Sequence, residues 1–121
     1  MDYKTFLFSW EGRINRAKWW LGQLFLLVAA LIGCAVAFGI AIALELPALG
    51  LLAGVLIFLP LLYAGVCLSI KRFHDRDKSG WWVCIQFVPL IGVFWYLIEC
   101  GILSGTVGPN RFGPDPLEGQ M

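Results

Sequence analysis

The sequence contains few charged residues. Asp, Glu, Lys and Arg make up 14% of its 121 residues, whereas hydrophobic residues make up 60%. Typical globular domains carry about 25% charged residues, because their surfaces must face water. The composition therefore excludes an ordinary soluble domain and indicates a surface that faces lipid.

Charge is absent altogether from two long stretches, residues 21–44 and 48–70, and a third stretch, residues 81–103, contains only Glu99. A helix of about 20 apolar residues crosses the hydrocarbon core of a bilayer. The first stretch is too long for the apolar part of a signal peptide and lacks a small-residue cleavage site, so we expect it to remain as an anchor. We predict an all-α fold, a single polytopic membrane domain (1–121) with three transmembrane helices, a short interfacial segment before them and a Gly/Pro-rich tail (104–121).

Residues that usually bind metals are scarce. His74 is the only histidine, and the four cysteines lie in the apolar stretches without a C-x-x-C pair. A metal site requires three or four converging ligands, so we expect no metal and no cofactor. The sequence also lacks a nucleophile with an adjacent base, a phosphate-binding glycine loop and a nucleic-acid-binding module. We therefore assign no enzymatic activity and expect no nucleic-acid partner.

The cations are distributed unevenly around the apolar stretches. Four precede the first stretch, four lie between the second and the third, one follows the third, and none lies in the connection 45–47. By the positive-inside rule, the N-terminus and residues 71–80 are cytoplasmic. Five of the six tryptophans fall at the same predicted interface, which indole rings favour. An unbroken third helix would then place the C-terminus in the periplasm or outside the cell.

The third stretch also allows a second topology. Pro89 and Gly92 interrupt it, and proline removes a backbone hydrogen bond from a helix. The chain could turn back there as a re-entrant hairpin, but irregular backbone at membrane depth requires surrounding protein or water. We prefer the straight helix, in which Glu99 reaches the outer interface. Protonation of Glu99, or its pairing with a neighbour, are the alternatives.

Apolar residues before the first stretch recur at helical spacing. They occupy positions 6, 10, 14 and 17, with basic residues on other faces. This pattern predicts a short helix in the headgroup region, and an irregular basic tail is the alternative.

Small residues mark the expected contact faces of the first two helices, because they let helices approach closely in lipid. They recur every fourth position at 29, 33, 37 and 41, and Gly50 and Gly54 open the second stretch. With only three residues between them, the two helices should form an antiparallel hairpin. The small-residue faces could pack within the monomer or in a homo-oligomer.

The densest polar segment is residues 71–80, which leads into two tryptophans. His74 and Asp75 are weak candidates for acid/base or metal chemistry. A solvated loop in which Ser79 caps the following helix is the simpler interpretation. A third hypothesis concerns arginines on the predicted cytoplasmic face, which could bind anionic lipid headgroups. They are Arg13, Arg16, Arg72 and Arg76.

Four motifs follow one another along nearly the whole chain. They are Gly12-Arg13-x-x-Arg16-x-x-Trp19-Trp20, Arg72-x-His74-Asp75-x-x-x-Ser79-Gly80-Trp81-Trp82, Pro89-x-x-Gly92 and Gly105-Thr106-x-Gly108-x-Asn110-Arg111-Phe112-Gly113-Pro114-Asp115-Pro116. Together they resemble the bacterial inner-membrane family known as domain of unknown function 805, the YhaH-like proteins. Two departures are slight: Trp19 stands where tyrosine is common, and residues 71–73 stand where two arginines and a leucine are common.

The resemblance implies a membrane protein without an established activity. It also implies that the basic lead-in, the His-Asp loop and the tail motif are important segments of the protein. A straight third helix would separate the tail motif from the other two across the membrane, whereas a re-entrant segment would bring all three together. This contrast makes the second topology worth testing.

We expect an integral protein of the bacterial inner membrane whose cytoplasmic face binds anionic lipid or a membrane partner. Two other functions remain open. The chain could be one subunit of an oligomeric transporter or channel, with a polar lining of Gln23, Ser69, Gln86 and Glu99. A membrane enzyme would instead use His74 and Asp75.

Overall fold

The computed structural model describes residues 3–117. In that range the regular elements are all helical: α1 (Tyr3–Phe8), α2 (Arg16–Ala43), α3 (Pro47–Asp75), the 3₁₀ helix η1 (Gly80–Phe87), α4 (Ile91–Leu97) and the π-helix η2 (Ile98–Ile102). The predicted all-α class of helical membrane protein is therefore confirmed.

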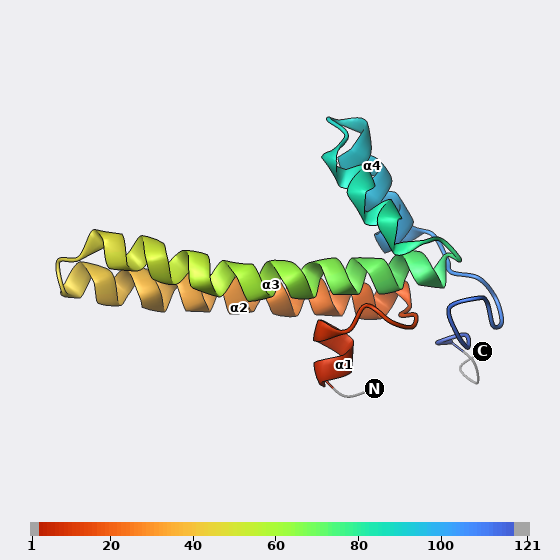
Figure 1. The fold of residues 1–121 in the computed structure, drawn as a ribbon, viewed down its shortest axis with the longest axis horizontal. Helices are drawn as coiled ribbons and strands as arrows, with labels where there is room; N and C mark the ends of the chain where they lie inside the picture. Colours follow the sequence, from red (N-terminus) through yellow and green to blue (C-terminus); the bar gives the residue numbers. More distant parts are fainter. Residues whose placement is uncertain (1–2, 118–121) are drawn as a thin grey trace.

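α2 and α3 form a long antiparallel pair, joined by a tight turn at one end (Figure 1). Both are apolar over a length that crosses a membrane. The small-residue face of α2 packs against α3. A Cβ added to Gly33 would lie 3.2 Å from Ile57 Cγ2, and a Cβ added to Gly50 would lie 2.9 Å from Ala41 Cβ. The close approach that the small residues predicted is therefore used within the monomer.

α2 and α3 end in the same kind of turn. A residue with positive φ follows each helix, Glu45 at 56° and Asp77 at 59°. After Asp77, the backbone N–H of Lys78 donates to the carbonyl of Phe73 at 2.9 Å, which closes a Schellman motif. The turn satisfies carbonyls at the end of α3 and ends the helix.

The third apolar stretch does not form the unbroken transmembrane helix that we predicted. It folds into two short arms, η1 and the continuous α4–η2 segment (Ile91–Ile102), which lie side by side and lean away from the long pair (Figure 1). Each arm is shorter than the length that crosses a membrane. The alternative topology, a hairpin at Pro89 to Gly92, is the one observed. We call residues 80–102 the short hairpin.

The elbow of the short hairpin explains why the chain turns. Leu90 has φ 64° and ψ −65°, and the N–H of Ile91 donates to the carbonyl of Pro89 at 2.7 Å, which is a γ-turn. A Cβ on Gly92 would overlap the carbonyl oxygen of Ile85 on the other arm. Proline and glycine at these positions therefore permit a turn that a regular helix could not make.

The short hairpin returns the chain to the end of the long pair from which it left (Figure 1). The tail after it crosses the last turn of α3, where the N–H of Thr106 donates to the carbonyl of Asp75 at 2.7 Å. We call this end of the molecule the polar end; it contains residues 9–18, 71–79 and 99–117. The tail and the N-terminal lead-in therefore meet at the polar end, whereas a straight third helix would separate them.

The helical part of the lead-in is shorter than predicted. α1 ends at Phe8, and the following loop carries Ile14 into the core, where it is 1% exposed. This core lies beside the polar end and joins all the elements except the far half of the long pair. Its buried members include Leu7, Ile14, Trp19, Leu26, Leu68, Phe73 and Cys100.

Candidate functional site

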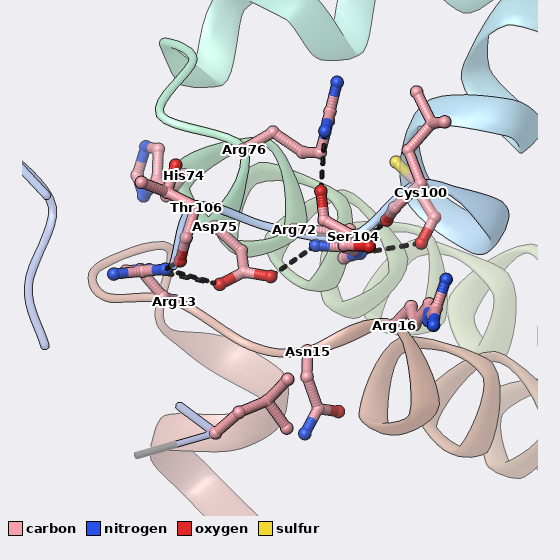
Figure 2. Close-up of polar contacts among 12 residues, drawn as sticks. Arg13, Asn15, Arg16, Arg72, His74, Asp75, Arg76, Cys100, Ser104 and Thr106 are labelled. Atoms are coloured by element: carbon pink, nitrogen blue, oxygen red, sulfur yellow. Dashed lines mark hydrogen bonds and ion pairs between the residues drawn. The ribbon is translucent and has the colours of Figure 1, made fainter. Parts of the chain in front are cut away.

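The carboxylate of Asp75, in the last turn of α3, forms the centre of the polar end (Figure 2). Arg13 donates to Oδ1 from Nε at 3.1 Å and from Nη2 at 3.0 Å, and Arg72 donates to Oδ2 from Nη1. All three side chains are at most 3% exposed. Buried charges are tolerated when they are paired and hydrogen-bonded, and this arrangement meets both conditions. We call Arg13, Arg72 and Asp75 the arginine cluster.

Arg13 also holds the tail. Its Nη2 donates to the carbonyl of Thr106 at 2.6 Å, and its Nη1 donates to the carbonyls of Gly108 and Gly113 at 2.8 and 3.2 Å. A guanidinium has five N–H donors, so these contacts and those to Asp75 use its whole capacity. Gly108 and Gly113 have φ of 79° and 135°, which side chains disfavour. Arg13 therefore ties the lead-in to both α3 and the tail.

Arg72 joins α3 to the short hairpin. Its Nε donates to the carbonyl of Cys100 at 2.8 Å, and its Nη2 donates to the carbonyl of Leu103. Carbonyls at a helix C-terminus lack partners within the helix, so a cation there is favourable. A Cβ on Gly105 would overlap the carboxylate of Asp75. The tail thus crosses the arginine cluster where only glycine fits.

We predicted that Glu99 reaches the outer interface, with pairing to a neighbour as an alternative. In the structure Glu99 pairs with two cations at the polar end. Arg76 Nε donates to Oε2 at 2.8 Å, and Lys78 Nζ donates to Oε1. Glu99 reaches these cations because η2 returns toward α3 instead of continuing away from it. Burial raises the pKa of Glu99, but the hydrogen bonds from Lys78 and Arg76 outweigh it, and the pKa falls below its ordinary value of 4.5.

Two polar side chains fix the tail in its conformation. Asn110 Nδ2 donates to the carbonyl of His74 at 2.9 Å. Asp115 accepts hydrogen bonds from the backbone N–H groups of Leu117 and Gly108, at 2.9 and 2.8 Å. These two hydrogen bonds lower the pKa of Asp115. The Asn and Asp of the tail motif therefore shape the backbone that Arg13 binds.

The remaining polar residues of the tail motif lie further out. Arg111 is 63% exposed in its side chain and pairs with Asp77 at 3.4 Å. Pro114 and Pro116 flank Asp115 in the chain. Arg111 therefore lies on the outside of the tail and not in the arginine cluster.

His74 and Asp75 are neighbours in sequence but have different partners. His74 Nδ1 lies 3.0 Å from the carbonyl of Gly12, which can only accept, so Nδ1 carries a proton. The imidazole stacks on Phe112 with ring centroids 4.0 Å apart. Within residues 3–117 no hydrogen bond joins the two side chains, so they do not form the acid/base pair that their adjacency suggested.

The structure separates the four arginines that we predicted to bind lipid. Arg13 and Arg72 are buried in the arginine cluster. Arg16 is exposed and donates to the carbonyl of Ile102, and Arg76 is 26% exposed in its side chain and donates to the carbonyl of Ser104 at 2.6 Å. Only Arg16 and Arg76 therefore present surface that a lipid can reach.

The first two motif tryptophans attach α2 to the rest of the fold. Trp19 is 2% exposed and donates from Nε1 to Ser69 Oγ at 3.3 Å. Trp20 donates from Nε1 to the carbonyl of Gly101 at 2.8 Å, and a Cβ on Gly101 would press into its ring. Trp19 is thus a core residue, whereas we had expected it at the lipid interface.

The second pair of motif tryptophans begins the short hairpin. Ser79 Oγ accepts a hydrogen bond from the N–H of Trp81 at 3.3 Å, which confirms the predicted cap. A Cβ on Gly80 would lie 2.8 Å from Ile70, so this glycine lets η1 pack closely on α3. Trp81 is 83% exposed, and Trp82 is 37% exposed. This pair retains the expected surface position.

Sequence reasoning missed two structural contributors. Asn15 caps α2 by accepting a hydrogen bond from the N–H of Lys18 at 2.8 Å, and its position just before a long helical pattern was a usable signal. Lys71 is fully buried and donates to the carbonyls of Thr5 and Phe6 at the end of α1. Nothing in the local sequence distinguishes this buried lysine from the exposed cations around it.

The sequence of the chain is similar to a protein family and to bacterial inner membrane proteins. A family model described as "Protein of unknown function (DUF805)" matches residues 7–114. The chain is 38% identical over 109 residues to the inner membrane protein YhaI of Escherichia coli (strain K12), covering 89% of this chain and 86% of YhaI.

Two further relatives come from the same strain. The chain is 41% identical over 63 residues to the inner membrane protein YhaH, covering 52% of this chain and 48% of YhaH. It is 27% identical to the uncharacterized protein YiiR over an alignment of 141 residues, covering 95% of this chain and 90% of YiiR. No solved structure matches the chain significantly.

Proposed function

Because the chain belongs to the DUF805 family and has inner membrane proteins among its relatives, we propose that it is an inner-membrane protein that binds anionic phospholipid headgroups at its polar end. The fold brings the lead-in, the end of α3 and the tail motif to one place, next to the ends of the two membrane-length helices. That place is where lipid headgroups lie when the long pair spans the bilayer.

The excess of positive charge at the polar end carries the proposal. The polar end contains eight Lys and Arg side chains but only five Asp and Glu side chains, which is an excess of three positive charges. The anionic surface of the cytoplasmic leaflet attracts such charges by about 1 kcal/mol each. The eight cations are Arg13, Arg16, Lys18, Lys71, Arg72, Arg76, Lys78 and Arg111, and the five carboxylates are Glu11, Asp75, Asp77, Glu99 and Asp115.

The exposed and the buried cations have different roles in the proposed headgroup binding. Arg16 and Lys18 are exposed at the start of α2, so they can contact a headgroup directly. Arg13 and Arg72 add to the local field, but they cannot contact lipid without leaving the arginine cluster. The exposed rings of Trp10 (54%) and Trp81 (83%) suit the headgroup region.

Native mass spectrometry of the purified protein in mild detergent tests the proposal. The parent should bind phosphatidylglycerol more tightly than phosphatidylcholine, and the preference should shrink in high salt because exposed charges are screened. Replacing the two exposed cations at the start of α2 (Arg16→Gln with Lys18→Gln) should weaken phosphatidylglycerol binding on the order of tenfold.

The matched control keeps the charge and changes the side chains, as Arg16→Lys with Lys18→Arg. This variant should bind phosphatidylglycerol about as well as the parent. Equal binding of the two lipids by the parent, at low salt, would overturn the proposed function.

Acid/base chemistry at His74 is a second candidate, favoured by one observation. The bond from Nδ1 to Gly12 fixes the imidazole with Nε2 beside Gly80, at a cavity of about 430 Å³ that Trp10 and Trp81 also line. If this chemistry is the function, His74→Gln should abolish the cellular phenotype that the gene complements, whereas the Arg16 and Lys18 variants should only weaken it. Full complementation by His74→Gln would exclude this candidate.

A further inference from the structure

A groove inside the membrane-embedded part of the fold is not used by the proposed headgroup contacts. It has a volume of about 250 Å³ and lies between α2, α3 and the short hairpin. Most of its lining is apolar, from Leu26 and Ala30 of α2 and from Phe58, Leu61 and Leu62 of α3. An open apolar groove at this depth faces the acyl chains of the bilayer.

Polar groups interrupt this lining at one end. The Nε2 of Gln23 is buried and has no hydrogen-bond partner within residues 3–117. Gln86, on the η1 arm of the short hairpin, lines the same groove. Tyr96, on the α4 arm, also lines it, but its hydroxyl is already hydrogen-bonded to Ser69. A buried amide donor without a partner costs free energy, and no water is available in the hydrocarbon region to supply one. The groove therefore requires an acceptor from outside the chain.

The position of Gln23 relative to Arg16 narrows the identity of that acceptor. The two residues are two helical turns apart on α2, which places them on the same face at about 10 Å separation. Arg16 and Trp20 both contact η2, so this face of α2 looks toward the short hairpin. A cation at the interface and an amide donor deeper in the membrane match the phosphate and the acyl ester carbonyl of one glycerophospholipid.

We infer that the groove is a binding site for one diacyl glycerophospholipid. The ester carbonyl accepts a hydrogen bond from Gln23 Nε2, with Gln86 beside it, and the acyl chain follows Leu26, Leu61 and Leu62 into the groove. The phosphate lies toward Arg16. The inference rests on the proposed function for the headgroup and adds a fixed position for the ester and the chain.

An ester-to-ether comparison isolates the carbonyl from the headgroup. Diacyl phosphatidylglycerol and its dialkyl ether analogue carry the same headgroup and charge, but only the first has ester carbonyls. The parent should bind the diacyl lipid about fivefold more tightly than the ether lipid, the effect of one hydrogen bond. Gln23→Leu should bind both lipids equally, because leucine has no donor.

Groove filling provides an independent test with a matched control. Ala30→Phe places a ring in the groove, whereas Ala35→Phe places the same ring on the exposed surface of α2. We expect Ala30→Phe to lower the affinity for diacyl phosphatidylglycerol at least fivefold and Ala35→Phe to leave it unchanged. Thermal midpoints in lipid-free detergent check folding, and Gln23→Leu should be at least as stable as the parent there, since it removes an unpaired donor.

The two proposals fail in different ways. If the parent prefers the ester lipid even in the phosphatidylcholine series but shows no anionic preference, the groove stands and the headgroup proposal falls. Equal affinity of the parent for ester and ether lipids, or equal affinities of Ala30→Phe and Ala35→Phe, would overturn the groove site.

Discussion

Arg13 and Asp75 lie 62 residues apart in the sequence and form an ion pair of 3.0 Å in which the side chains are 1% and 3% exposed. The pair joins the lead-in to the last turn of α3, and the other donors of Arg13 hold the tail. Three segments that carry the family motifs therefore depend on one guanidinium.

Removing that guanidinium should destabilise the protein strongly. Arg13→Gln leaves the Asp75 carboxylate with one cation fewer and removes the guanidinium donors from three tail carbonyls. We expect a loss of about 3 kcal/mol in the free energy of unfolding, measured by denaturation in mild detergent. The control is Arg111→Gln, which breaks the exposed pair with Asp77 and should cost less than about 1 kcal/mol. Equal effects of the two substitutions would show that the Arg13 contacts add no stability.

The elbow of the short hairpin predicts opposite effects for two glycines. Gly92→Ala places a methyl group on the carbonyl oxygen of Ile85, so it should destabilise the protein by about 2 kcal/mol or more. Gly39→Ala, exposed near the C-terminal end of α2, meets no atom within 4 Å and should stabilise the protein by up to about 1 kcal/mol. Thermal unfolding of both variants in the same detergent checks the sign. A neutral Gly92→Ala would mean that the two arms are not as close as the structure has them.

The long helix pair could be predicted from sequence because its signal is local. Residues 21–44 and 48–70 contain no charge, and the small residues at 29, 33, 37 and 41 mark one face by spacing alone. The short hairpin could not be derived in this way. Hydropathy does not distinguish one long helix from two short arms, and the contacts that hold the base of the short hairpin against α3 join residues distant in the chain.

The ion pair of Glu99 predicts a dependence of stability on pH. Hydrogen bonds from Lys78 and Arg76 hold the folded-state pKa of Glu99 below its ordinary value of 4.5. A depressed pKa stabilises the folded protein above the unfolded-state pKa, and that contribution is lost as the pH falls through the folded-state pKa. The parent should therefore be more stable than Glu99→Gln at pH 7, and the difference should shrink as the pH falls below about 4.5.

Unfolding curves of both proteins between pH 7 and pH 3 measure this difference. The comparison with Glu99→Gln removes the contributions of the other carboxylates, which both proteins share. A difference that stays constant over the whole range would contradict the assignment of Glu99 to this ion pair.

The contact between the small residues of α2 and α3 predicts a graded loss of thermal stability when they are enlarged. Gly50→Leu should disturb packing most, because even a Cβ there would lie 2.9 Å from Ala41, and Gly33→Leu should follow, with 3.2 Å to Ile57. Leu27→Ala should change thermal stability little, because Leu27 is 55% exposed. Equal thermal midpoints for the glycine variants and the parent would remove the packing role of this face.

The residues of the arginine cluster were recognisable as candidates, but their role was not. Charge and motif marked Arg13, Arg72 and Asp75 as candidates. We expected the two arginines to be exposed because they lie outside the apolar stretches. Their burial depends on the tail folding over them, with Gly105 against the Asp75 carboxylate. That contact exists only because the short hairpin turns back, so the turn and the burial of the two arginines have one physical origin.

The return of the chain at Pro89 to Gly92 is therefore the central claim, and the location of the two termini tests it most directly. Paired reporters, one active only in the periplasm and one only in the cytoplasm, should be fused in turn to the N-terminus and after Met121 of the full chain. A periplasmic reporter fused after Glu45 of a truncated chain provides the control for the opposite side. We expect both termini to report the cytoplasm and the Glu45 fusion to report the periplasm. A periplasmic C-terminus together with a cytoplasmic N-terminus would contradict it.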